Sequence, residues 1–303
     1  MKFIENIKFN YIFISIINYA MLSNSLSIQT SNNYMNNKNN FNFRSTFSTN
    51  EANYLTIQKA LLSNNQVKVL NIIKKSPRLS TEGLFFDNGI IYESGFYKNK
   101  SFLLKKEFKS NKLIKTIPLL SLSGKGIAKC GDNFYQLTEK EKKVLKYSYP
   151  NLDLISTSDL DNEMIKGEGL TSLSKDTLVA TDGSNNIYIL SCQYDLNVIQ
   201  SIPINDELGN PINGLLDITV VGNYLYANRE GEYKIFKINP RSGLVVRTYD
   251  LMNLINYEIK MKSINKNDIA SGSILNGITY DEERKIFILT GRNWAFYYEV
   301  KLD

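Results

Sequence analysis

A β-hairpin that recurs along the chain constrains the fold more than any other feature of the sequence. The first copy, residues 81–93, places an Asp-Asn-Gly turn between two short apolar runs. Asn and Gly accept the positive φ that a tight hairpin turn requires, so the pattern predicts two antiparallel strands. Each copy follows a glycine, except for one degenerate copy that has an aspartate there. These five anchors are Gly83, Gly126, Gly169, Asp217 and Gly277.

The spacing of the anchors predicts a β-propeller. Successive anchors are 43, 43, 48 and 60 residues apart, and four-stranded propeller blades repeat about every 40–45 residues. We therefore expect an all-β fold, a five-bladed β-propeller that spans residues 67–303. The long last interval predicts an insertion at about 252–272, which we expect to form a short helix or a lid over one face.

The two ends of the propeller region are expected to meet. A lone apolar strand at 67–73 precedes the first hairpin, and the chain closes with a second apolar strand at 295–302. Propellers commonly pair such strands within one blade, because closure removes open sheet edges that promote aggregation. The sequence thus predicts that the N-terminal strand completes the last blade. We expect a single folded domain and a monomer.

The region before the propeller has two parts. Residues 1–27 combine Lys2 and Lys8 with an apolar run at 11–22, which is typical of a secretory signal. An uncleaved anchor is the alternative, and otherwise no stable membrane embedding is expected. Residues 28–66 are rich in Asn and Ser, which predicts a linker with a short helix at 51–66. The protein is therefore expected in the secretory pathway or the extracellular space.

The residue types that the sequence lacks limit the catalytic and metal-binding sites that the protein can form. The 303 residues include no histidine and two cysteines, which excludes Ser-His-Asp and Cys-His catalysis and histidine-ligated metal sites. No phosphate cradle or calcium loop has the required spacing, so we expect neither a metal nor a cofactor. Cys130 and Cys192 lie at non-equivalent positions of consecutive blades. A disulfide is possible there, but two buried free thiols are the favoured interpretation.

The net charge of +6 does not indicate a nucleic-acid partner. The lysines are spread over hairpin turns and outer strands and are mixed with glutamates, as in residues 139–143. Solvated faces account for this mixing better than a phosphate-binding patch.

The residues that precede the anchors are expected to gather at one end of the central channel. A propeller carries equivalent positions of its blades around one axis, so these side chains face the same end. In chain order they are Glu82, Lys125, Glu168, Leu216 and Asn276. The set includes two carboxylates, a lysine and an amide. It therefore predicts a polar cluster at the end of the channel where propellers usually bind ligands. A buried ion-pair network without catalytic function is the structural alternative.

Several short motifs resemble those of the plant-type glutaminyl-peptide cyclotransferases, or glutaminyl cyclases, over residues 67–303. In chain order they are Glu82-Gly83-Leu84, Tyr92-Glu93-Ser94-Gly95, Gly169-Leu170, Thr181-Asp182-Gly183, Tyr226-Ala227-Asn228, Leu275-Asn276-Gly277-Ile278 and Thr290-Gly291-Arg292-Asn293-Trp294. The resemblance implies a secreted five-bladed propeller that needs no metal. It also implies conversion of the N-terminal glutamine of peptides and proteins to pyroglutamate, with release of ammonia.

The sequence departs from that family at the catalytic position. The family carries its catalytic glutamate in a Gly-Glu-Gly-Leu motif of blade two, where this chain has Lys125. The same four-residue string occurs in blade three and contains Glu168. The catalytic hypothesis is that Glu168 shuttles the proton while Lys125 or Arg292 polarises the amide. A neighbouring lysine lowers the pKa of a carboxyl group, which weakens it as a base.

The resemblance also assigns candidate substrate-binding residues. Glu82 stands where the family has glutamine, and Glu139 and Glu230 stand where aromatic pocket walls are expected. The complete candidate set for substrate binding is Glu82, Asn228, Asn276, Arg292 and Trp294. The alternative hypotheses are an inactive propeller that binds peptide or protein ends through its charged channel mouth, and a structural propeller that acts through its rim.

Overall fold

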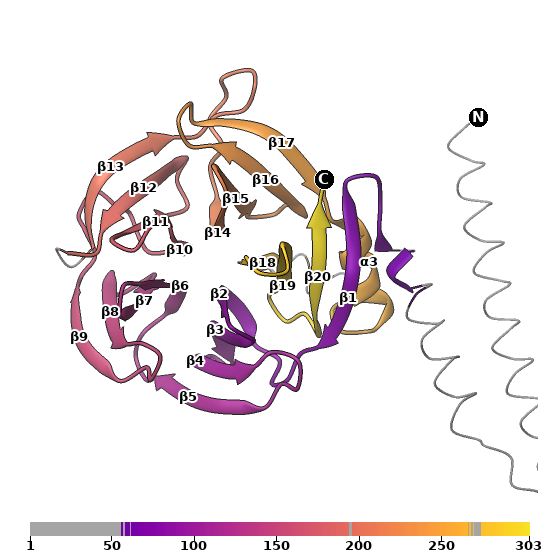
Figure 1. Cartoon of the computed structure of the whole chain (residues 1–303), viewed down its shortest axis with the longest axis horizontal. Helices are drawn as coiled ribbons and strands as arrows, with labels where there is room; N and C mark the ends of the chain where they lie inside the picture. The colour runs from indigo at the N-terminus through magenta and orange to yellow at the C-terminus, as the bar shows by residue number, and fades with distance from the viewer. Residues whose placement is uncertain are drawn as a thin grey trace, which may run out of the picture. The chain divides into compact units, whose positions relative to one another are not determined.

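A computed structural model describes residues 56, 58–60, 62–193, 196–265, 267, 269 and 274–303. Five four-stranded antiparallel sheets surround a central axis (Figure 1), which confirms the predicted all-β, five-bladed propeller. These sheets belong to a unit that spans 53–303. The predicted leader, residues 1–27, lies outside the described residues, as does most of the predicted linker. The described residues 56, 58–60 and 62 are helical.

Each blade begins with its innermost strand and proceeds outward. Blade one contains β2 (Ser80–Asp87), β3 (Ile90–Tyr97), β4 (Lys100–Glu107) and β5 (Leu113–Leu119). Blade two contains β6 (Gly124–Cys130), β7 (Asn133–Thr138), β8 (Lys143–Ser148) and β9 (Leu154–Asp159). Blade three contains β10 (Leu170–Ser172), β11 (Thr177–Thr181), β12 (Asn186–Ser191) and β13 (Asn197–Pro203). Blade four contains β14 (Leu215–Val221), β15 (Tyr224–Arg229), β16 (Lys234–Asn239) and β17 (Leu244–Asp250).

Blade five closes the ring with strands from both sides of the propeller sequence. It contains β18 (Leu275–Asp281), β19 (Ile286–Gly291), β20 (Phe296–Leu302) and, as its outermost strand, β1 (Val67–Lys74). β1 runs antiparallel to β20, from Val67 opposite Leu302 to Lys74 opposite Phe296. The predicted closure by the N-terminal strand is therefore confirmed.

A β-bulge with one extra residue lies at the anchor or directly before it in four innermost strands. The pairing register shifts between Thr81 and Gly83, and equivalent shifts occur in β6, β14 and β18. A bulge places two residues opposite one and re-aims a side chain. The residue before each anchor can therefore turn toward the axis, as the cluster described below shows.

Four of the five anchors are glycines because the innermost strands meet at the axis. A Cβ atom on Gly83 would lie 2.7 Å from the Lys125 carbonyl oxygen, and one on Gly169 would lie 2.2 Å from the Leu216 carbonyl oxygen. Backbone therefore packs directly on backbone, and a side chain larger than hydrogen is excluded there. We call this ring of close contacts the waist, and the end of the channel where the innermost strands begin the mouth.

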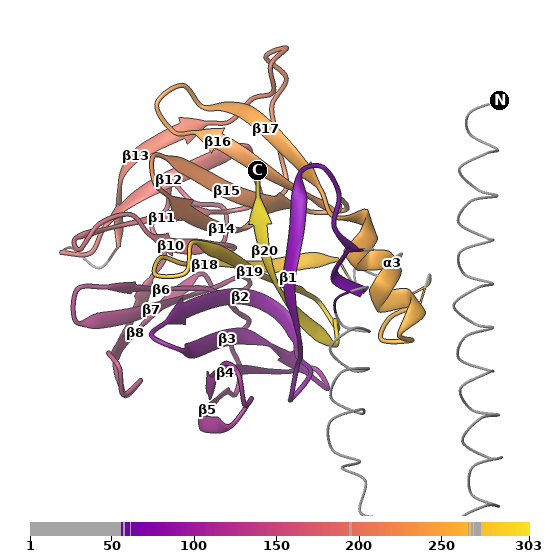
Figure 2. The same ribbon diagram turned by 45° about the vertical axis from the view of Figure 1, so that its right-hand side comes forward.

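The insertion after β17 contains the helix α3 (Met252–Lys260). The helix lies at the rim of the ring beside β1, outside the channel (Figures 1 and 2). The Glu258 carboxylate accepts hydrogen bonds from the Ala295 and Phe296 backbone N–H groups and from the Tyr298 hydroxyl. α3 is thus fastened to the edge of blade five and does not cover the central axis. No helix among the described residues is long and apolar enough to cross a membrane.

Cys130 and Cys192 form a disulfide. The interpretation of two free thiols was wrong because it compared equivalent blade positions only. Cys130 ends the innermost strand of blade two, and Cys192 follows β12 in blade three. The twist of neighbouring sheets brings these different positions together, with Cα atoms 6.5 Å apart, within the range that a disulfide spans.

Candidate functional site

The Lys125 ammonium group is the centre of a charged cluster at the mouth. Its Nζ atom lies 2.9 Å from Glu82 Oε2, 3.2 Å from Glu168 Oε2 and 3.2 Å from Glu139 Oε2. Glu82, Lys125 and Glu168 precede the anchors of three consecutive blades, and Glu139 follows β7 at the same end. All but Glu139 are buried. The structure thus brings together the ionic residues that blade equivalence predicts.

Two further cations extend this arrangement. Lys166 Nζ lies 2.6 Å from Glu168 Oε1 and 3.3 Å from Glu139 Oε1. The Arg292 guanidinium lies 2.7 Å from Glu82 Oε2. Sequence reasoning missed Lys166, although its position two residues before Glu168 was a usable signal. We call the set of three carboxylates and three cations the mouth cluster; it comprises Glu82, Lys125, Glu139, Lys166, Glu168 and Arg292.

The ion pairs favour the charged forms of Lys125, Glu139 and Arg292 in the mouth cluster. Burial opposes the charge on Lys125, but Glu82 and Glu168 outweigh it and raise the pKa of Lys125. Burial likewise opposes the charge on Glu139, yet Lys125 and Lys166 lower the pKa of Glu139. The pKa of Arg292 is raised because Glu82 outweighs its desolvation. Charge balance therefore makes a buried polar site tolerable.

Polar atoms without partners adjoin the cluster on the side of blades four and five. Asn276 donates to Glu82 Oε2 at 3.1 Å, and Asn228 donates to the Leu275 carbonyl at 2.7 Å. Within the described residues, the Oδ1 atoms of both asparagines and the Nε atoms of Arg292 and Trp294 (Nε1) make no hydrogen bond although they are buried. Buried polar groups are normally paired. Two acceptors and two donors together match the hydrogen-bonding groups of a carboxamide.

Blade four contributes no polar group before its anchor. Leu216 is buried there, and the anchor itself, Asp217, accepts a hydrogen bond from the Ile278 backbone N–H at 2.9 Å. Burial raises the pKa of Asp217 well above its usual range, against the effect of that hydrogen bond. The side chain joins blades four and five at the waist. The sequence showed Asp217 only as a departure from the glycine of the other repeats and did not indicate that it joins two blades.

A second charged cluster lies away from the channel, between blades one and five. Glu93 Oε1 lies 2.8 Å from Lys75 Nζ and Glu93 Oε2 lies 2.9 Å from Lys106 Nζ, and all three side chains are fully buried. The hydroxyls of Thr81 and Tyr297 donate to the same carboxylate. Burial opposes its charge, but Lys106 and Lys75 lower the pKa of Glu93 to about 2. We call Lys75, Glu93 and Lys106 the enclosed cluster.

Comparison with known proteins decides the family. Residues 43–302 match the family described as glutamine cyclotransferase. This chain belongs to that family. A glutaminyl-peptide cyclotransferase of Arabidopsis thaliana is 23% identical over 179 residues, which cover 59% of this chain and about half, 52%, of that relative.

A solved structure supports the fold of this cyclotransferase-family chain. The crystal structure of a glutaminyl cyclase from Myxococcus xanthus matches with a TM-score of 0.69 at 22% identity, covering 78% of this chain and 96% of that one. At this identity the likeness concerns the fold.

Proposed function

We propose that the protein is a glutaminyl-peptide cyclotransferase whose catalytic carboxylate has moved from blade two to blade three. The observation that carries the proposal is the 3.2 Å contact between Lys125 and Glu168. Lys125 occupies the position at which the family resemblance implies a glutamate. The carboxylate of Glu168 reaches that same place from the neighbouring blade. The glutamate is therefore supplied by a different residue within the same mouth.

The groups without partners provide the binding step. The carboxamide of an N-terminal glutamine presents one carbonyl acceptor and two N–H donors. Asn228 Oδ1 and Asn276 Oδ1 accept from its amino group, while Arg292 Nε donates to its carbonyl oxygen. Each contact uses an atom that has no partner among the described residues. Binding of the amide therefore gives hydrogen-bond partners to the buried polar atoms of the protein and to the polar atoms of the substrate.

The α-ammonium group of the substrate pairs with Glu168. Lys166 is the exchangeable partner of Glu168, because its side chain is 34% exposed whereas that of Lys125 is 4% exposed. An incoming ammonium group replaces Lys166 and keeps the local charge balance. Lys125 stays in place and positions the carboxylate.

Cyclisation then needs one proton carrier and one stabilised oxyanion. The α-ammonium group first releases one proton to solvent and becomes an amine. The amine nitrogen attacks the side-chain Cδ, a C–N bond forms, and Glu168 accepts the second proton that the nitrogen loses. Arg292 stabilises the negative charge on the amide oxygen in the tetrahedral intermediate. Glu168 returns the proton to the departing nitrogen, the original C–N bond breaks, and ammonia leaves. The carboxylate is restored and the five-membered lactam is the product.

A second candidate function is binding of peptide ends without turnover. It is favoured by one observation, that each carboxylate of the mouth cluster already contacts at least one cation. A carboxylate held by cations is a weaker base. On this reading the mouth exchanges Lys166 for a substrate ammonium group but performs no chemistry.

The proposal includes export and action as a monomer on peptides or proteins with N-terminal glutamine. The Cys130–Cys192 disulfide supports export, since structural disulfides persist mainly in oxidising compartments.

Ammonia release from a glutaminyl dipeptide by the full chain tests the proposed function. Turnover by the parent, with loss of most of it in Lys125→Glu, is expected because that change removes the cation that positions Glu168. An inert parent combined with an active Lys125→Glu variant contradicts the proposal, since it shows a scaffold whose catalytic carboxylate was lost. Binding of the dipeptide without ammonia release by either protein supports the second candidate.

A further inference from the structure

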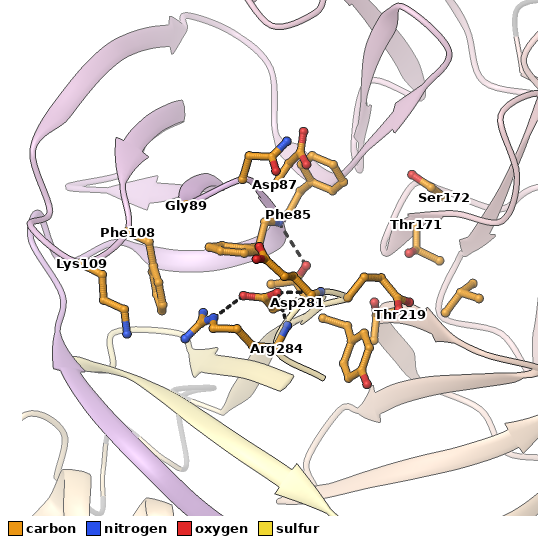
Figure 3. Close-up of a pocket in the computed structure, with 17 residues that line it drawn as sticks. Phe85, Asp87, Gly89, Phe108, Lys109, Thr171, Ser172, Thr219, Asp281 and Arg284 are labelled. Atoms are coloured by element: carbon orange, nitrogen blue, oxygen red, sulfur yellow. Dashed lines mark hydrogen bonds and ion pairs between the residues drawn. The ribbon is translucent and has the colours of Figure 1, made fainter. Parts of the chain in front are cut away.

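A cavity of about 530 Å³ lies at the end of the channel opposite the mouth. It is lined by residues at or near the ends of four innermost strands, β2, β10, β14 and β18, together with the turns that follow β2 and β18 (Figure 3). Glu82 and Asp87 lie near opposite ends of β2. Five residues of extended strand separate them by roughly 16 Å. The cavity is therefore remote from the mouth cluster.

The waist separates the two ends of the channel. A Cβ atom on Gly126 would lie 2.4 Å from the Glu168 carbonyl oxygen, and the Asp217 side chain bridges to Ile278 at the same level. Backbone contacts and the Asp217 side chain thus occupy the space between the mouth and the cavity. A ligand in the cavity does not use the residues of the proposed cyclotransferase site, so this inference stands apart from that function.

Equivalent positions of three blades supply hydroxyl groups to the cavity. Thr171, Thr219 and Thr279 each follow their anchor by two residues and are buried. Thr279 accepts a hydrogen bond from the Phe86 backbone N–H at 3.1 Å. The hydroxyls of Thr171 and Thr219 make no hydrogen bond to any described residue. Figure 3 shows both on the side of the cavity that faces Phe85 and Asp281.

The cations that line the cavity are already neutralised. The Arg284 guanidinium lies 2.5 Å from Asp281 Oδ2 and 2.6 Å from Glu299 Oε1. Lys109 Nζ lies 3.0 Å from the same Glu299 atom. An anionic ligand would therefore have to compete with two carboxylates for these groups.

Acceptor oxygens, by contrast, remain available. The Tyr149 hydroxyl donates to Oδ2 of Asp87, which leaves Oδ1 of that carboxylate free. The Glu283 carboxylate has no ion-pair partner among the described residues. The lining thus offers carboxylate and hydroxyl acceptors in excess over free donors, which favours a ligand that carries several N–H groups and a positive charge.

Aromatic rings add a second preference for a cation. Phe85, Phe86, Phe108 and Tyr280 line the cavity. The Arg284 guanidinium already lies 5.7 Å from the centre of the Phe86 ring, which shows that a cation is accommodated against this wall. A ring face attracts a cation through its quadrupole. Carboxylates, hydroxyls and aromatic faces together are suited to an ammonium or guanidinium group.

We propose that this cavity binds a small organic cation, an aliphatic molecule with ammonium or guanidinium groups. Asp87 and Glu283 pair with its charge, Thr171 and Thr219 accept its N–H groups, and Phe85 packs on its methylene chain. A volume of about 530 Å³ is within the range of small-molecule sites.

Isothermal titration of the full chain with spermidine and with agmatine tests this assignment. We expect saturable binding of at least one of them, weakened about tenfold in Asp87→Asn and in Glu283→Gln, because each loses one charge-assisted contact. Glu283 is exposed, so its substitution leaves the fold intact. Glu168→Gln at the mouth is the matched control and retains full binding.

Three results overturn the proposal. The first is that neither amine binds at millimolar concentration. The second is that binding is lost in Glu168→Gln but kept in Asp87→Asn and Glu283→Gln. The third is that the protein binds maltose or inorganic phosphate more tightly than either amine.

Discussion

The mouth cluster and the enclosed cluster have similar chemistry but different surroundings. In the enclosed cluster one carboxylate is held by two lysines and two hydroxyls, and the three charged side chains are fully buried. In the mouth cluster three carboxylates share three cations, and Glu139 and Lys166 reach solvent. Within the part of the chain that the structure describes, unpaired donors and acceptors adjoin the mouth cluster but not the enclosed cluster. The difference indicates that the enclosed cluster stabilises the blade interface, whereas the mouth cluster has capacity for a ligand.

The largest stability effect is expected at the enclosed cluster. Glu93→Gln leaves two buried lysines without their carboxylate, and breaking a buried pair in this way costs about 3–5 kcal/mol. Chemical denaturation measures the free energy of unfolding. Lys100→Met, on the exposed end of β4, is the control and is expected to change it little. A loss below about 1 kcal/mol in Glu93→Gln would mean that the enclosed cluster is not structural.

The same cluster predicts acid sensitivity. The pKa of Glu93 falls to about 2 in the folded protein, from about 4.3 in an unfolded chain. Its stabilising contribution is therefore complete above the unfolded value and is lost as the pH falls from about 5 toward 2, an effect of about 3 kcal/mol. Unfolding free energy measured between pH 7 and pH 3 is expected to decline more steeply in the parent than in Glu93→Gln. Parallel curves would contradict this account.

Asp217, at the waist, should give the opposite dependence of stability on pH. Because burial raises its pKa, the folded protein retains this proton to a higher pH than the unfolded chain does. Stability therefore falls as the pH rises above the unfolded value near 3.9. Asp217→Asn retains an acceptor for the Ile278 N–H and removes this penalty. We expect the Tm at pH 8 to rise, by about 2–4 °C for each kcal/mol gained, with no gain at pH 3. A lower Tm at pH 8 would show that the carboxyl proton itself is required.

The smallest effect is expected at an exposed pair. Lys143 and Asp159 lie 2.5 Å apart on blade two with both side chains well exposed. Such pairs contribute about 0–1 kcal/mol. Lys143→Met should therefore leave the free energy of unfolding nearly unchanged, and a loss that approaches that of Glu93→Gln would show that burial does not distinguish the clusters.

The repeat made the fold predictable from sequence, because hairpin turns and anchors recur at blade spacing. Because equivalent positions of the blades face the same end of the channel, the repeat also predicted that Glu82, Lys125 and Glu168 lie close together. It could not reveal the enclosed cluster. Lys75 follows the end of β1, whereas Glu93 and Lys106 lie at different positions of β3 and β4.

Contacts between non-equivalent positions of different blades could not be predicted from the sequence either. The disulfide joins an innermost strand to a turn of the next blade, and Lys166 enters the mouth from a loop. The insertion at 252–272 was predicted to form a short helix or a lid. The place of its helix α3 at the rim depends on hydrogen bonds from Ala295 and Phe296, at the start of β20, to Glu258, which the sequence pattern does not show.

The most direct test of the central claim compares activity and stability in Glu168→Gln. Ammonia release from a glutaminyl dipeptide is expected to fall by about 10²–10⁴-fold, as for loss of a general acid–base group. The free energy of unfolding should fall far less than in Glu93→Gln, because Lys125 retains two other carboxylates. Full activity in Glu168→Gln, or a stability loss equal to that of Glu93→Gln, would contradict a catalytic role for the mouth cluster.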